Sequence, residues 1–337
     1  MTTRRSFLAA AALSPVAWAR AGAAGQPGAP DVAGGPPLSR VFAAGPPAAV
    51  LVCVLAPESL LGWPSRLDPE SLAWIGPPAA DRPVLGRLAG RGSTVSLETL
   101  VQLKPELVLD VGTVDATHAS MAERVRQQTG LRCELLGGRL AESPALLRRA
   151  GALLGVPGRA EGLARRAEQI LAEVERERPR HASTSVYLAR GADGLETGLG
   201  GSINVEALEF VGARNVAAAG GEGGITRVSL EQVLAWDPEV LVTQDSAFAG
   251  SVRSDPVWRG VRAVRGGRIL CAPSLPFGWL DNPPGINRLV GVLWLARRLD
   301  SGQGGDDLRE AVRAFYAAFY RITLSGSQLQ RLLGETT

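Results

Sequence analysis

The most constraining feature of the sequence is a pattern that occurs twice, as VSLETLVQLKPELVLD at residues 95–110 and as VSLEQVLAWDPEVLVT at residues 228–243. The second copy begins 133 residues after the first (95 to 228), and six positions carry the same residue in both. A supersecondary unit that occurs twice, with this many residues between the copies, predicts two similar lobes. The space between two lobes is a common place for a ligand. Two copies are too few for a solenoid or a propeller.

Each copy predicts a helix, a proline stop and a strand. Ser96 and Ser229 are suited to cap the helix starts, and a glutamate in each first turn favours the helix dipole. Apolar residues at helical spacing follow until Pro105 and Pro238 end the helices. A continuous apolar run then predicts a strand covered on both faces, as in a parallel sheet.

Polar residues follow both predicted strands. Ligands of open α/β sheets lie beyond the carboxyl ends of the strands, so these loops are expected to face a cleft. The residues are Asp110, Gly112 and Thr113 in the first copy and Thr243, Gln244 and Asp245 in the second.

The first 21 residues are typical of a twin-arginine export signal. Arg4-Arg5 precede Phe7-Leu8 and an apolar stretch that is too short for an ordinary transmembrane helix. Residues 22–38, rich in Gly, Pro and Ala, are expected to form a flexible leader. No cysteine lies near the expected cleavage site, so the sequence predicts a periplasmic protein without a lipid anchor.

Composition argues against several classes of function. The formal charge is +3, and removing Arg4, Arg5 and Arg20 with the signal leaves no basic excess for nucleic acid or membrane binding. Only two histidines are present, and no Ser-His-Asp, HExxH or CxxC arrangement occurs. We therefore expect a binding protein, not an enzyme, with an exported cofactor-carrying enzyme as a minor alternative. Cys53 and Cys133 are either bridged or buried free thiols.

A long helix is expected between the two copies. Pro157 opens it, since proline suits the first helical position, and it continues to about Arg178 with a charged outer face. At 1.5 Å per residue it is about 33 Å long. The sequence thus predicts an α/β fold of two similar Rossmann-like lobes joined by one long rigid helix, with a ligand cleft between them. The expected boundaries are 39–155, 156–180 and 181–337.

The ordered set of segments resembles the periplasmic binding proteins that serve ABC importers of ferric siderophores, cobalamin and related metal chelates. The resemblance rests on both repeat copies, the long helix, GSINVEALEFVGARNVA (201–217) and PFGWLDNPPGINRLVGVLWLA (276–296). With FYAAFYRITLSGSQLQRLL (315–333), the chain is similar to a subgroup that handles iron chelates, or molybdate and tungstate.

This resemblance implies a monomeric protein that delivers a ferric siderophore or related chelate to an inner-membrane ABC permease and its ATPase. The alternative ligand is molybdate or tungstate, and no covalent cofactor is expected. Members of the family often carry a docking glutamate on their first helix, but residues 47–51 contain no acid. Glu58, one or more turns later, is expected to dock with the permease from this lobe, and Glu206 or Glu209 from the other lobe.

The candidate ligand-binding residues combine cationic, hydrogen-bonding and aromatic side chains. Arg190 ends a predicted strand, where its guanidinium fork could hold carboxylate, hydroxamate or oxyanion oxygens. An aromatic wall is expected from Trp279 in a Pro/Gly-framed loop. Asp281 and Arg288 are expected to pair with each other. The remaining candidates are Phe277, Trp63, Arg87, Ser202, Asn204 and Gln244.

Replacing both Arg4 and Arg5 with lysine should block export, because the twin-arginine pathway reads that pair. Cell fractionation should find the precursor in the cytoplasm. Normal periplasmic amounts of the double variant would contradict the assignment of the signal.

Overall fold

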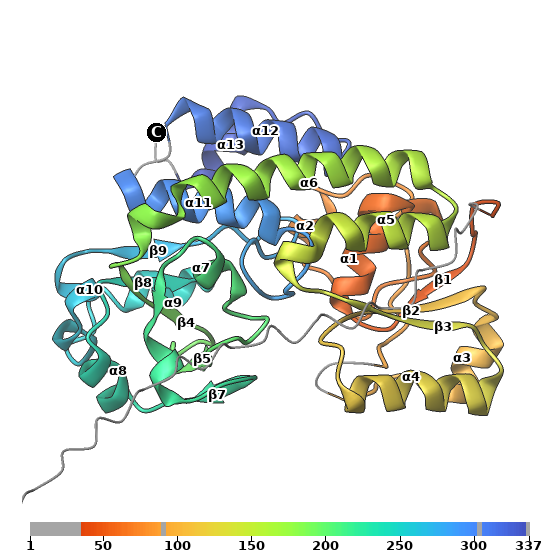
Figure 1. The fold of residues 1–337 in the computed structure, drawn as a ribbon, viewed down its shortest axis with the longest axis horizontal. Helices are drawn as coiled ribbons and strands as arrows, with labels where there is room; N and C mark the ends of the chain where they lie inside the picture. Colours follow the sequence, from red (N-terminus) through yellow and green to blue (C-terminus); the bar gives the residue numbers. More distant parts are fainter. Residues whose placement is uncertain (1–34, 89–91, 302–304, 335–337) are drawn as a thin grey trace, which may run out of the picture. The chain divides into compact units, whose positions relative to one another are not determined.

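The computed structural model describes residues 35–88, 92–301 and 305–334, so the predicted signal peptide and nearly all of the predicted leader lie outside the described residues. Within the described ranges, no helix combines the length and apolar character needed to cross a membrane. The described chain contains two separate parallel sheets, each flanked by helices (Figure 1).

The first sheet has three parallel strands, with β2 (Leu107–Gly112) between β1 (Val41–Ala43) and β3 (Cys133–Gly137). Successive side chains of a strand point to opposite faces. Leu107 and Leu109 therefore pack in one cluster with α1 (Pro46–Leu55) and α5 (Ser143–Leu154), whereas Val108 packs with α3 (Leu97–Leu103) and α4 (Ala116–Thr129). These elements form the N-terminal lobe, to which the short α2 (Pro69–Leu72) also belongs.

The second sheet has four parallel strands in the order β6-β4-β8-β9. Its strands are β4 (Ser185–Ala189), β6 (Arg214–Asn215), β8 (Val240–Thr243) and β9 (Ile269–Cys271). A two-stranded antiparallel ribbon, β5 (Glu196–Gly198) with β7 (Ile225–Arg227), joins it at the end of β4 through a bridge between Arg190 and Glu196. The helices of this C-terminal lobe are α7 (Glu206–Phe210), α8 (Leu230–Trp236), α9 (Ser246–Ser251), α10 (Arg262–Arg265) and α11 (Arg288–Ser301).

The two sequence repeats form the same local structure. Ser96 accepts a hydrogen bond from the backbone N–H of Thr99 at 3.1 Å, and Ser229 accepts one from Gln232 at 3.2 Å. Both helices end on a non-glycine residue in the left-handed region, Lys104 at φ 46° and Asp237 at φ 41°. A proline follows each of these residues and the strands β2 and β8 come next, so the predicted supersecondary unit is confirmed in both lobes.

The predicted long helix is α6 (Pro157–Glu177), which packs against α5 of the N-terminal lobe and α11 of the C-terminal lobe (Figure 1). Near its start, Arg159 donates to Val54 O at 2.7 Å and to Phe319 O at 3.0 Å. That guanidinium thereby satisfies carbonyls at the ends of α1 and α12 (Asp306–Tyr320). The final helix is α13 (Gly326–Leu333). The exact lobe boundaries remain predictions.

Two helices of the C-terminal lobe are shorter than the sequence predicts. The sequence predicts a helix from Ile203 to Val211, where only the five-residue α7 forms, and a helix opened by Pro284, where α11 starts at Arg288. Asn282 has a φ of 57°, and residues 285–289 begin with turn hydrogen bonds before the helix. The segments that precede α7 and α11 are therefore irregular, and both belong to the cleft described below.

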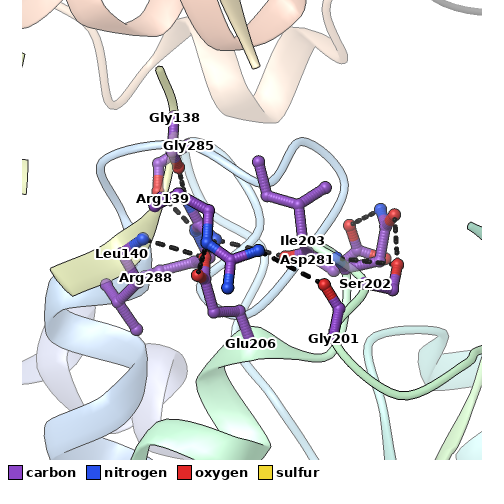
Figure 2. A network of polar contacts seen from close by, with 11 residues as sticks. Gly138, Arg139, Leu140, Gly201, Ser202, Ile203, Glu206, Asp281, Gly285 and Arg288 are labelled. Carbon is purple, nitrogen blue, oxygen red and sulfur yellow. Dashed lines mark hydrogen bonds and ion pairs between the residues drawn. The ribbon is translucent and has the colours of Figure 1, made fainter. Parts of the chain in front are cut away.

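A buried ion pair connects the two lobes. Arg288, only 2% exposed, donates to Glu206 Oε2 at 2.6 Å and also to the carbonyl of Gly138, which follows β3 of the N-terminal lobe. Glu206 Oε2 also accepts from the backbone N–H of Leu140 at 2.8 Å. Figure 2 shows Arg139 and Arg288 converging on the Glu206 carboxylate, with 2.8 Å between Arg139 Nε and Glu206 Oε1. We call this group the interlobe tie.

The interlobe tie overturns two predictions from the sequence. Glu206 is 9% exposed and fully engaged inside the protein, so its predicted role in docking a permease is wrong. Arg288 pairs with Glu206 and not with Asp281. The spacing of Glu206 and Arg288 in the sequence contains no sign of this long-range pairing.

Breaking the tie from one side should strongly destabilise the protein. Removing one partner of a buried pair leaves the other charge uncompensated, so Arg288→Met and Glu206→Gln should each cost about 3–5 kcal/mol of unfolding free energy. The double variant should cost less than the two single losses combined. Urea unfolding measures all three values.

The matched control is Arg165→Met, which breaks the exposed pair with Glu161 on α6. Solvent screens that pair, so its loss should be much smaller. The account would be contradicted if the double variant lost as much unfolding free energy as the two single variants together. It would also be contradicted if the single variants lost no more than the control.

Candidate functional site

A cleft of about 400 Å³ lies between the lobes and takes its walls from both. The carboxyl end of β2 and the start of α1 form the first wall, and the end of β4 with the segments before α7 and α11 form the second. Parallel sheets bind ligands at this edge of their strands. None of the described residues that line this cleft is Phe, Tyr or Trp. The polar side chains on its walls are Arg87, Asp110, Thr113, His118, Arg190, Asn204, Asp281 and Asn282.

Asp281 brings three of the predicted site residues together. Its carboxylate, 2% exposed, accepts from Arg190 Nε through one oxygen and from Asn204 Nδ2 at 2.7 Å through the other. Its backbone N–H donates to Gln244 Oε1 at 2.6 Å. Gly278 permits this approach, because a Cβ there would lie 2.2 Å from Gln244 Nε2. Asp281 therefore orients the polar wall of the C-terminal lobe.

Arg190 retains an unused donor in this wall. Its Nη1 is buried, lies 3.7 Å from Glu196 Oε2 and makes no hydrogen bond with any residue in the described part of the chain. The guanidinium borders both the cleft and an adjoining hollow of about 460 Å³ that Gln244 also lines. An unsatisfied buried donor is costly, and a ligand oxygen would remove that cost.

Ser202 supports the wall without lining the cleft. It is 4% exposed, and its hydroxyl donates to Asn204 Oδ1 at 3.2 Å. Asn204 itself lines the cleft, so Ser202 orients that amide.

The N-terminal lobe contributes Arg87 and His118. Arg87 Nε donates to Gly92 O at 3.1 Å, which holds the guanidinium against its own loop at the cleft. His118 Nδ1 lies 2.8 Å from Asp115 Oδ1, and Asp115 also caps α4. His118 is not among the site residues predicted from the sequence. Asp115, the helix cap three residues earlier in the loop that follows β2, is the signal that could have found it.

The predicted aromatic wall is wrong for Trp279. The side chain is 0% exposed, and its Nε1 donates to the Tyr316 hydroxyl at 3.2 Å. The cause is Gly291 on α11, where a Cβ would lie 1.9 Å from Trp279 O. Without a side chain at this position the loop lies directly on the helix, and the indole enters the core.

Trp63 and Phe277 lie beside the cleft, not in it. Their ring centroids are 5.6 Å apart, and both border a neighbouring hollow of about 370 Å³. Trp63 Nε1 donates to Ala79 O at 2.9 Å, so its indole is anchored. This hollow shares Pro46, Asn282 and Pro283 with the cleft.

The other predicted residues are placed as follows. Glu58 is exposed, and Glu209 is half-buried with its carboxylate accepting from Gly201 N at 3.2 Å. Their docking role stays a prediction. Cys53 and Cys133 are buried free thiols in different apolar clusters, so the bridge is not formed. Burial raises the pKa of Cys53 to about 12 and that of Cys133 to about 11, which keeps both thiols protonated.

Comparisons with known proteins agree with this architecture. A family described as periplasmic binding protein matches residues 76–275, which is more than half of the chain. The protein belongs to the periplasmic binding protein family. Among curated relatives, the molybdate-binding protein MolA of Haemophilus influenzae is 34% identical over 119 residues. That match spans 34% of this chain and 33% of the relative, so it covers only a third of the relative's length.

Solved structures share the fold over most of the chain. An ABC transporter solute binding protein from Sulfurospirillum deleyianum has a TM-score of 0.78 at 24% identity, covering 89% of this chain and 95% of its own. MolA of H. influenzae bound to molybdate has a TM-score of 0.69 at 20% identity, and the match covers 87% of this chain and 95% of MolA. The vitamin B12 binding protein of Vibrio cholerae has a TM-score of 0.63 at 19% identity, and the match covers 78% of this chain and 97% of that protein. At these identities the similarity concerns the fold alone.

Proposed function

We propose that this protein is the solute-binding component of an ABC importer and that its cleft holds a small oxyanion of the molybdate or tungstate class. The ligand would be passed to a permease and its ATPase in the inner membrane. On this proposal the protein performs no chemistry on the ligand. The proposal favours the second of the two ligand classes expected from the sequence.

The observation that carries this proposal is the unused, buried N–H of Arg190 on the cleft wall. Charge-assisted hydrogen bonds to anions are among the strongest that a protein makes, and a guanidinium fork matches oxyanion geometry. Arg87 adds a second guanidinium on the opposite lobe, and Asn204 adds an amide. A cleft with these donors on both walls suits a compact anion that both lobes contact.

The start of α1 adds to the positive potential. Gly45, Pro46 and Pro47 line the cleft at the N-terminal end of this ten-residue helix. The helix dipole places partial positive charge there. Two prolines lack the N–H groups that usually bind anions at such a position, so α1 contributes potential more than hydrogen bonds.

The lining disfavours a large organic chelate. A ferric siderophore or cobalamin presents an extended organic surface against which aromatic walls pack well. The described lining residues of the cleft include no Phe, Tyr or Trp, and Trp279 is in the core. A volume of about 400 Å³ is also near the lower end for drug-sized ligands.

A ferric chelate remains the second candidate because of the neighbouring hollow. Trp63 and Phe277 border it, and it meets the cleft at Pro46, Asn282 and Pro283. A ligand that occupies both spaces would have an aromatic wall. Trp63→Ala should then weaken a ferric hydroxamate siderophore and leave molybdate affinity unchanged.

Arg190→Ala should weaken molybdate binding about ten- to hundredfold, because hydrogen bonds to charged groups contribute roughly 1.5–3 kcal/mol. Isothermal titration calorimetry with molybdate and with a ferric hydroxamate siderophore measures both affinities. Arg190→Lys keeps a cation beside Asp281 but lacks the fork, so it should also lose affinity.

The matched control is Arg227→Ala, which removes an exposed guanidinium on β7 that pairs with Asp193. This variant should bind like the wild type. Wild-type molybdate affinity in folded Arg190→Ala would remove Arg190 from the site. A wild type that binds the siderophore but not molybdate would replace the proposal with the second candidate.

A further inference from the structure

Resting on the proposed function, we infer that Asp110 is the specificity-determining residue of the cleft. In its protonated form it donates a hydrogen bond to a fully ionised oxyanion, and in its ionised form it repels that anion. Binding of molybdate is therefore coupled to uptake of one proton at Asp110. The same carboxylate would accept a hydrogen bond from an oxyanion that carries its own proton.

The position of Asp110 gives it access to the ligand. It lies near the carboxyl end of β2, the central strand of the first sheet, and lines the cleft. One carboxylate oxygen accepts from the backbone N–H of Val111 at 2.9 Å. The other oxygen makes no hydrogen bond and no ion pair with residues of the described ranges, so it is available to a ligand.

The charged and titratable groups around Asp110 do not neutralise it. His118 faces it from α4 and the Cys133 thiol from β3, and Arg87 in the loop before α3 lines the same cleft. Across the cleft, Arg190 is paired with Asp281. The start of α1 presents only glycine and proline. The carboxylate thus borders an anion-binding cleft without an ion pair to any residue in the described ranges.

The electrostatics around Asp110 determine whether molybdate affinity rises or falls with pH. Burial raises the pKa of Asp110, against the lowering influences of the Val111 N–H and of His118. A bound dianion would raise that pKa further, because a like charge disfavours ionisation. The affinity for molybdate should then be highest below the pKa of the free protein. It should fall by up to about tenfold per pH unit until the pKa of the complex is passed.

A weaker pH dependence is expected for an anion with its own proton. Hydrogenphosphate can donate to ionised Asp110, whereas molybdate near neutral pH cannot. Raising the pH from about 5.5 to about 7 should therefore weaken molybdate more than phosphate. Asp110 would thereby rank oxyanions by their protonation state.

Calorimetry tests this inference on the full mature protein, with micromolar molybdate at about pH 5.5, 7 and 8 and in two buffers of different ionisation enthalpy. The wild type should take up protons on binding and lose affinity as the pH rises. Asp110→Asn should show no proton uptake and a flat pH profile, and at about pH 8 it should bind molybdate about tenfold more tightly than the wild type.

Two further variants separate Asp110 from its neighbours. His118→Gln should keep the pH dependence, since the proton belongs to the carboxyl group and not to the imidazole. Glu134→Gln, which changes a carboxylate on β3 that pairs with Arg132 at 3.6 Å, should behave like the wild type. Proton uptake that persists in Asp110→Asn, or that disappears in His118→Gln, would overturn the inference.

The outcomes distinguish the two proposals. A wild type that binds molybdate without proton uptake overturns the role of Asp110 and leaves the proposed function standing. A wild type that binds no molybdate at any of these pH values overturns both. If Asp110→Asn fails to fold, the absence of proton uptake in the wild type, or its loss in His118→Gln, still overturns the inference.

Discussion

The buried contact between Arg288 and Glu206 is the interaction on which the rest of the structure depends. Two charges removed from water are stable only when their hydrogen bonds are satisfied, and here the backbone of both lobes supplies the partners: Gly138 O, Leu140 N and Ile203 O. Glu206 begins α7 and Arg288 begins α11, so the pair fixes the two segments that precede these helices. Those segments form the C-terminal wall of the cleft. The tie and α6 together therefore set how the two walls face each other.

The polar wall uses a second buried carboxylate in a different way. Asp281 satisfies Arg190 through one N–H and leaves another buried N–H unused. It also fixes the Asn204 amide and contacts Gln244 through its backbone. This arrangement holds the donors in place before a ligand arrives, which lowers the cost of ordering them on binding. On the opposite wall, one carboxylate oxygen of Asp110 has no hydrogen-bond partner among the described residues and can interact with a ligand in the cleft.

Much of the fold could be predicted from the sequence because its signals are local. The serine caps, the prolines after Lys104 and Asp237, and the apolar runs of β2 and β8 each act within a few residues, and α6 begins at the predicted proline. The site was only partly predictable, because its contacts are long-range. Arg190 and Asn204 followed from their positions after strand and glycine signals, but their shared partner Asp281 is 91 and 77 residues away. Trp279 was misplaced because its burial depends on the absence of a side chain at Gly291, and Glu206 because its partner is 82 residues away.

The most direct test of this account is the distance across the cleft, measured by pulsed electron spin resonance between labels on Met121→Cys of α4 and Ile225→Cys of β7. Both positions are exposed, and the exposed Cys271 is replaced by serine. With the tie and an unbroken α6 holding the lobes, the wild type should give one narrow distribution. Saturating molybdate should shift it by no more than about 2–3 Å, since closure would require breaking α6 hydrogen bonds. A shift on the order of 10 Å, as in hinged domain closure, would contradict the claim that the interlobe tie fixes the cleft.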